Sequence, residues 1–185
     1  MKPVLKYLIV STAYLACYFA LAALSFGLWT EHRVLPWYPQ AGLGLGVLLA
    51  FGRRYVPVIT LAAFLSGYFL YPAKLGLVFS LSLALTTSLG YGAGAEFLTR
   101  LGGIDIRLQR ARDVWWCLAL ACVLPIFVGA AGLGAFVAAG DMKPRDFPAA
   151  LGEWWLGDSI GILTLLPAML SVILPKLGIG GSLAP

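Results

Sequence analysis

Charged residues are scarce in this chain. Asp, Glu, Lys and Arg make up 11% of its 185 residues, whereas a soluble domain typically carries about 25%. So little charge cannot cover the surface of a water-soluble globule, which excludes a soluble enzyme or a soluble binding domain. The length suits one compact membrane bundle and leaves no room for a soluble enzyme domain beside it.

Histidine is almost absent, since His32 is the only one. A lone histidine between Glu31 and Arg33 cannot make a usual zinc site or a two-histidine haem site. The sequence also lacks a nucleophile elbow, a P-loop and an HExxH motif. We therefore expect no catalytic residues, no metal site and no cofactor.

Cysteine provides no covalent framework. Cys17, Cys117 and Cys122 all lie inside apolar runs, and no CxxC is present. An odd number of cysteines does not form a disulfide scaffold. We interpret the three as small hydrophobic side chains that are buried or face lipid.

Hydrophobic residues dominate instead, at 61% of the chain with a mean hydropathy of +0.90. A helix needs roughly 20 apolar residues to cross a hydrocarbon core of ~30 Å. The sequence therefore predicts an all-α, polytopic membrane helix bundle of about six transmembrane helices in the lipid bilayer. The expected segments are about 4–29, 35–52, 55–71, 75–97, 114–139 and 154–174.

The first two segments are unusual. Residues 8–29 carry no charge and exceed the ~7–15 apolar residues of a signal peptide, so we expect a retained helix. The second segment has Pro36 and Pro39 at its start. A regular helix over 40–52 would be only about 20 Å long at 1.5 Å per residue, which is short for a full crossing.

Basic residues predict the orientation, because cytoplasmic loops carry an excess of Lys and Arg. With both termini cytoplasmic, the main inner loop is 99–113 and the outer loops are 30–39 and 140–152. The net charge of +5 then reflects topology, and we expect no nucleic-acid partner. The inner side receives Lys2, Lys6, Arg53, Arg54, Arg100, Arg107, Arg110, Arg112 and Lys176, and the outer side receives Arg33, Lys74, Lys143 and Arg145.

Small residues recur at the spacing that allows close helix packing. A GxxxG pair lets two helix backbones approach where no hydrophobic effect drives association in lipid. Three pairs on different segments favour a tight bundle. They are Gly42/Gly46, Gly90/Gly94 and Gly157/Gly161.

Two acidic residues fall near the ends of predicted spans, where an ionisable group is costly. Glu96 precedes Arg100 by four residues, which predicts a local ion pair. Asp158 has two interpretations. It either lies in the first turn of the sixth helix and favours the helix dipole, or forms the polar floor of an outer pocket, with Arg33 or Arg145 as its partner.

Two aromatic–polar segments are expected at similar depth on the outer side: 37–40 (WYPQ) and 154–158 (WWLGD). Their aromatic residues either form an interfacial belt or line a small-molecule pocket, which typically has apolar walls and few polar groups. In the second case the ligand-binding residues are Trp37, Gln40, Trp154, Trp155 and Asp158.

The same segments resemble a known family. Residues 37–42 (WYPQAG) and 52–57 (GRRYVP) are similar to the Trp-x-Pro-x-(Ala/Ser)-Gly…Gly-Arg-Arg-x-x-Pro stretch of the first membrane-associated sensor (MASE) domain family. Residues 154–161 (WWLGDSIG), followed by Pro167, resemble its Trp-Trp-x-Gly-Asp-x-x-Gly…Pro stretch, and 112–114 (RDV) fits as well. The resemblance spans about 37–167. Gln40 departs from it, since the family commonly has a small residue or Pro there.

The resemblance implies a multi-pass sensory input domain of the bacterial inner membrane, which regulates a cytoplasmic histidine kinase, diguanylate cyclase (GGDEF) or phosphodiesterase (EAL). It implies a single domain over 1–174, a linker over 175–185, and a homodimer, since such outputs work as dimers. The alternative is a six-helix substrate-binding subunit of a vitamin or small-molecule transporter, which would dock an energising partner through its small-residue motifs. A membrane enzyme would need convergent titratable residues that the sequence does not provide.

Overall fold

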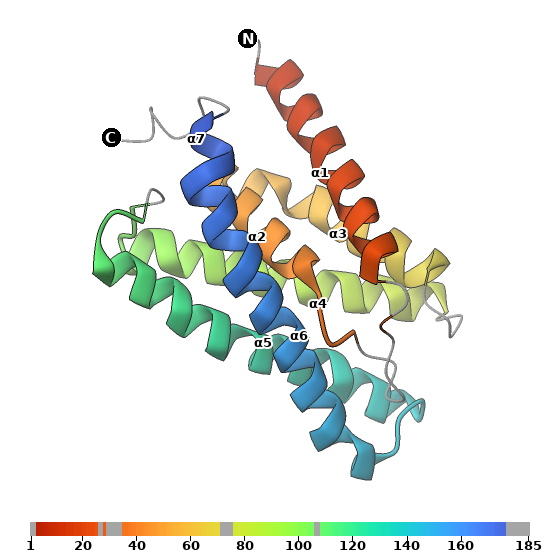
Figure 1. The fold of residues 1–185 in the computed structure, drawn as a ribbon. Helices are drawn as coiled ribbons and strands as arrows, with labels where there is room; N and C mark the ends of the chain where they lie inside the picture. The colour runs from red at the N-terminus through yellow and green to blue at the C-terminus, as the bar shows by residue number, and fades with distance from the viewer. Residues whose placement is uncertain (1–2, 26–27, 29–34, 71–75, 106–107, 177–185) are drawn as a thin grey trace.

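Six α-helices form most of the protein. The computed structural model describes residues 3–25, 28, 35–70, 76–105 and 108–176, and these contain no strand. The all-α prediction is therefore confirmed. The helices are α1 (Pro3–Ser25), α2 (Pro39–Phe51), α3 (Val56–Phe69), α4 (Leu77–Glu96), α5 (Ala111–Ala139) and α6 (Phe147–Ala168) (Figure 1).

Shorter helical turns connect or extend these helices. Two are π-helical, at the end of α4 and directly after α6. The chain is helical as far as Lys176, and the rest of the expected linker, 177–185, lies outside the described residues. The short elements are η2 (Arg53–Tyr55), η3 (Phe97–Leu101), η4 (Pro144–Asp146), η5 (Met169–Ile173) and α7 (Leu174–Lys176).

Four helical stretches are long and apolar enough to cross a membrane: Pro3–Ser25, Leu77–Leu101, Ala111–Ala139 and Pro144–Lys176. Large apolar side chains such as Trp115 and Phe127 of α5 are each 68% exposed, as expected of a surface that faces lipid. The protein is thus a multi-pass membrane protein. The helices α2 and α3 are shorter, because each begins with a proline in its first turn and α2 ends at Gly52.

The short helix α2 lies at the centre of the bundle. Every residue of α2 from Pro39 to Ala50 is buried, as expected of a helix that is hydrophobic all round. Its 13 residues are about 20 Å long, the length predicted for this segment. It ends at Gly52, whose φ of 84° favours glycine because a Cβ is disfavoured there.

Glycines of α6 make room for the chain that leads into α2. A Cβ at Gly157 would meet the carbonyl oxygen of Leu35, and one at Gly161 would meet that of Tyr38. The Tyr38 N–H donates a 3.1 Å hydrogen bond to the Gly157 carbonyl. This GxxxG pair therefore packs mainly against a non-helical segment, 35–38, and not only against a helix. Non-helical backbone at membrane depth requires such cover by protein.

Contacts between α1 and the end of α2 identify one end of the bundle. The Lys6 ammonium of α1 lies 5.7 Å from the centre of the Phe51 ring at the end of α2. Tyr7 stacks on Tyr55 with ring centres 4.9 Å apart. We call this the basic end. The start of α1 and α7 lie toward the same end in Figure 1, and we call the opposite end the distal end.

The sixth helix begins earlier than the sequence predicted. It was expected to start at Trp154, but α6 starts at Phe147, inside the expected outer loop 140–152. Pro148 lies in its first turn, where proline is favoured, and Gly152 does not interrupt it. Asp158 consequently lies about three turns into the helix, and the interpretation of Asp158 as a first-turn carboxylate is wrong.

Candidate functional site

The Asp158 side chain of α6 accepts hydrogen bonds from residues of both α4 and α6. It is buried, with 3% exposure. Its Oδ2 accepts a hydrogen bond from the Tyr91 hydroxyl of α4 and a 2.9 Å hydrogen bond from the Trp154 indole Nε1, one turn earlier on α6. A carboxylate removed from water requires such donors, because an unpaired buried charge is very costly.

Arg145, one of the two arginines that were expected to pair with Asp158, contacts another carboxylate instead. Arg145 is 76% exposed, and its Nε lies 3.5 Å from the Asp146 carboxylate. Arg33 lies outside the described residues. Among the described residues, the donors to this carboxyl group are a tyrosine and a tryptophan, which are both neutral.

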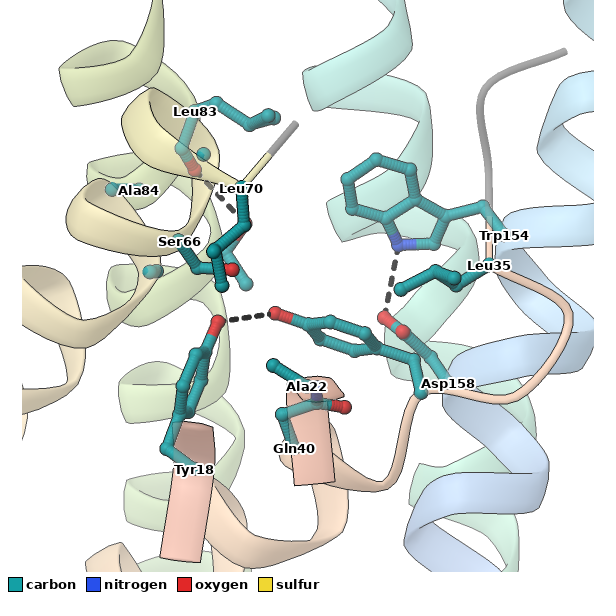
Figure 2. Close-up of a pocket in the computed structure, with 14 residues that line it drawn as sticks. Tyr18, Ala22, Leu35, Gln40, Ser66, Leu70, Leu83, Ala84, Trp154 and Asp158 are labelled. Atoms are coloured by element: carbon teal, nitrogen blue, oxygen red, sulfur yellow. Dashed lines mark hydrogen bonds between the residues drawn. The ribbon is translucent and has the colours of Figure 1, made fainter. Parts of the chain in front are cut away.

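A cavity of about 60 Å³ lies beside Asp158 in the distal half of the bundle (Figure 2). Its walls come from α1, the segment leading into α2, the start of α2, the end of α3, the first half of α4 and the first half of α6. Apolar side chains such as Leu35 and Leu83 form most of the lining. The volume is well below the ~300–1,000 Å³ of pockets for drug-sized ligands.

Five more polar side chains border this cavity: Tyr18, Tyr38, Gln40, Ser66 and Thr87. The hydroxyl oxygens of Tyr18 and Tyr38 lie 2.7 Å apart in a hydrogen bond. Gln40 is 3% exposed, and neither its Oε1 nor its Nε2 has a hydrogen-bond partner among the described residues. Buried amides are almost always hydrogen-bonded. The unpaired Gln40 amide at a cavity wall is therefore the least satisfied polar group near Asp158.

The structure gathers three of the five predicted site residues. Gln40, Trp154 and Asp158 line the cavity, whereas Trp37 and Trp155 do not. The Trp155 indole instead donates a 2.7 Å hydrogen bond to the Cys122 carbonyl of α5. Successive residues of an α-helix point about 100° apart, so Trp154 and Trp155 cannot both face one cavity.

Sequence reasoning missed Tyr18 and Tyr91, and it included Tyr38 in the segment 37–40 without naming it as a ligand-binding residue. Tyr18 and Tyr38 line the cavity, and Tyr91 holds Asp158. Tyr91 lies between Gly90 and Gly92 in an apolar span, and a tyrosine buried there needs a partner for its hydroxyl. That requirement was a usable signal, although it does not identify the partner.

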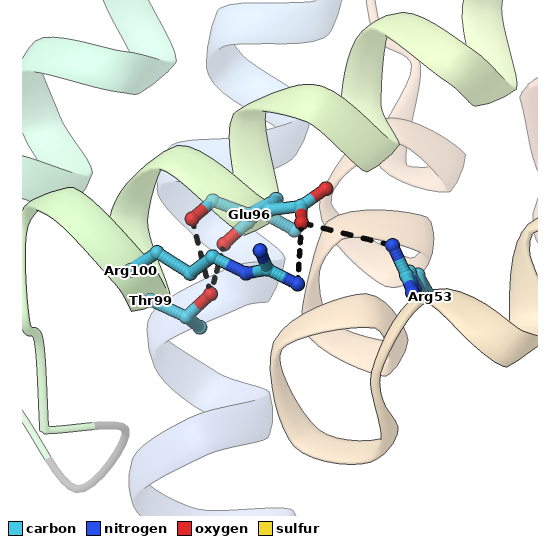
Figure 3. A network of polar contacts seen from close by, with 5 residues as sticks. Arg53, Glu96, Thr99 and Arg100 are labelled. Atoms are coloured by element: carbon cyan, nitrogen blue, oxygen red, sulfur yellow. Dashed lines mark hydrogen bonds and ion pairs between the residues drawn. The ribbon is translucent and has the colours of Figure 1, made fainter.

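The basic end holds the ion pair predicted from spacing. Arg100 Nη2 lies 2.9 Å from Glu96 Oε1, which confirms the i,i+4 pair. Arg53, from the turn between α2 and α3, adds a second contact at 3.9 Å that the sequence did not predict (Figure 3). All three side chains are at least 38% exposed, so the network contributes little to stability and is a poor candidate for a ligand site.

Comparison with known proteins gives one match. The MASE1 family model matches residues 7–175, a range that includes every described residue lining the cavity. No curated protein and no solved structure matches the chain.

Proposed function

The chain belongs to the MASE1 family of membrane sensor domains, and from that premise we propose that it detects a signal in its distal half and regulates a cytoplasmic output. The match covers nearly the whole chain. It therefore extends the resemblance seen in the short motifs at 37–42 and 154–161 to the whole domain. MASE1 domains are non-catalytic input modules. The membership favours a sensor over the alternative of a transporter subunit.

The observation that carries the proposal is the placement of Asp158. A buried carboxylate within a membrane helix marks a functional site by default. This one lies at a cavity, next to the unpaired Gln40 amide, and its donors come from both α4 and α6. A signal that changes the contacts of Asp158 would therefore change the link between α4 and α6, which both pack against α2 and α5.

The helix α6 is the proposed transmitter. It carries Trp154 and Asp158 in its first half and continues through η5 to Lys176. A ligand shifts a protein between two states only by its different affinity for them. We propose that occupancy of the cavity favours one packing of α6. The resulting movement would reach the cytoplasmic output through the end of the helical segment at Lys176.

The proposed orientation has both ends in the cytoplasm of a bacterial inner membrane, with six helices alternating across the bilayer. Lys6 and Arg53 gather at the basic end with Arg100, and the start of α1 lies on the same side as α7. A basic end of this kind favours the cytoplasmic side. The output would be a histidine kinase, a diguanylate cyclase or a phosphodiesterase that works as a homodimer.

The test is the output of the chain joined to a diguanylate cyclase domain, measured as cellular cyclic di-GMP. Asp158→Asn keeps the size of the side chain and removes its charge. We expect the variant to lose regulated output while its membrane level and Tm stay near those of the wild type. Glu96→Gln, which neutralises an exposed carboxylate at the basic end, is the matched control and should retain output.

Wild-type output from a stable Asp158→Asn protein would contradict the proposal, because Asp158 would then serve the fold alone. Loss of output with an equal loss of membrane protein would be tested further with Gln40→Leu, which leaves the carboxylate and both its donors in place. Unchanged output from Gln40→Leu would also count against a sensory cavity.

A further inference from the structure

The described lining of the cavity beside Asp158 contains one carboxyl group and no basic group. Asp158 is the one charged residue among the lining side chains that the structure describes. Its donors, Tyr91 and Trp154, are neutral. A buried charge is tolerated when an opposite charge accompanies it, so an occupant with one positive charge would complement this site.

Gln40 provides a second, independent indication of an occupant. Both polar atoms of its amide are buried without a partner, and the residue lines the same cavity. Figure 2 shows Gln40 and Asp158 among the side chains that line this cavity. The Gln40 Oε1 is an acceptor, so together with the carboxylate it can receive N–H bonds from one bound group.

The remaining walls distinguish an organic cation from a metal ion. Three aromatic residues, Tyr18, Tyr38 and Trp154, border the space, and Leu35 and Leu83 add apolar surface. Aromatic faces attract cations that carry N–H or C–H groups. Ca²⁺ and Mg²⁺ instead take six or more oxygen ligands, for which this largely apolar lining is a poor match.

From these features we propose that the cavity binds a small protonated amine, with its ammonium group between Asp158 and Gln40 and its alkyl part against the apolar wall. The volume of about 60 Å³ restricts the ligand to a few heavy atoms. The inference rests on the proposed sensory function and names the chemical class of its signal.

Binding is tested on the full chain in lipid nanodiscs, without any output domain. Methylammonium chloride and ethylammonium chloride are the probes, and sodium chloride at the same ionic strength is the reference. We expect the amines to raise Tm by about 2–4 °C at roughly five times their Kd. The shift should saturate, and tetramethylammonium, which has no N–H and is bulkier, should give none.

Variants test whether the amine-specific rise in Tm comes from binding at the cavity. Asp158→Asn and Gln40→Leu should each abolish the amine-specific shift, and Glu96→Gln should retain it. If Asp158→Asn does not fold, Gln40→Leu decides, because its carboxylate remains paired with Tyr91 and Trp154. No amine shift in the wild type, an equal shift with sodium chloride, or a shift that survives in Gln40→Leu would overturn the proposal.

The binding result and the output result are separable. An amine that binds the isolated chain without altering cyclic di-GMP in the fused protein would contradict the sensory function and support the ligand class. An output that depends on Asp158 in a protein that binds no amine would support the function and overturn the ligand class.

Discussion

The Tyr91 hydroxyl of α4 donates a hydrogen bond to the Asp158 carboxylate of α6, from a residue 67 positions away in the chain. This bond joins two helices at the wall of the distal cavity. We expect Tyr91→Phe to lower the free energy of unfolding by about 0.5–2 kcal/mol, as interhelical hydrogen bonds in membranes do. Tm in nanodiscs measures the change.

Tyr68→Phe is the control for that variant, because Tyr68 lies on α3 with 39% exposure and its replacement should leave Tm unchanged. The double variant Tyr91→Phe/Asp158→Ala should lose less stability than the two single variants added together, since each single variant already removes the same hydrogen bond. Strict additivity would show that the two side chains do not interact.

Glycine substitutions should differ according to what the new side chain meets. Gly157→Leu would press on the Leu35 carbonyl, which is backbone and cannot turn away, so we expect a loss of at least about 1–3 kcal/mol. Gly90→Leu meets the Val128 side chain at 2.6 Å, and it should be destabilising to a smaller degree. Thermal unfolding in detergent compares the two.

Gly134→Leu tests whether those losses come from packing. A Cβ at Gly134 of α5 meets no atom within 4 Å, so this variant should keep or slightly raise Tm. If Gly157→Leu has the same Tm as Gly134→Leu and the wild type, the close contact between α6 and the segment 35–38 is refuted.

Gln40→Leu should stabilise the ligand-free protein. An unpaired buried amide costs about 1–3 kcal/mol, and an apolar side chain of similar size removes that cost. We therefore expect Gln40→Leu to raise Tm in amine-free buffer while it removes the proposed amine binding. A lower Tm in amine-free buffer would show that the Gln40 amide already has a partner.

Topology is testable with paired reporters. Alkaline phosphatase is active only outside the cytoplasm, so its fusion to the C-terminus should be inactive and its insertion at Asp141, between α5 and α6, should be active. A fluorescent protein that matures only in the cytoplasm should give the reverse pattern. Active C-terminal phosphatase would contradict the orientation derived from the basic residues.

The helices were largely predictable because long apolar runs are a direct consequence of the bilayer's thickness. The short α2 was also predictable, since Pro39 fixes its start. The start of α6 was not. The expected outer loop ended at Gly152 because that stretch, with Lys143, Arg145 and Asp146, has the composition of a surface loop. In the structure, α6 begins at Phe147 with Pro148 in its first turn, and it includes the last six residues of that stretch.

The site was only partly predictable for a related reason. Residues of one motif, such as Trp154 and Trp155, are adjacent in sequence but face different neighbours in a helix. The Tyr91 partner of Asp158 depends on how α4 and α6 are placed around α2 and α5, and no local pattern contains that information. Gln40 was identified because it is a polar residue in an apolar segment, and polar residues within membrane spans often belong to functional sites.

The π-helical turn Met169–Ile173 sets the direction in which the chain leaves the sixth helix, as well as the length of that helical segment. A π-turn closes its hydrogen bonds over five residues instead of four. It therefore holds one residue more than an α-helical turn, and each residue of an α-helix corresponds to about 100° around the axis. Leu174 and Lys176 follow this turn directly. The azimuth at which the chain leaves α6 is thus set by a single extra residue, and deleting one residue within 169–173 would swing the exit by about a quarter of a circle.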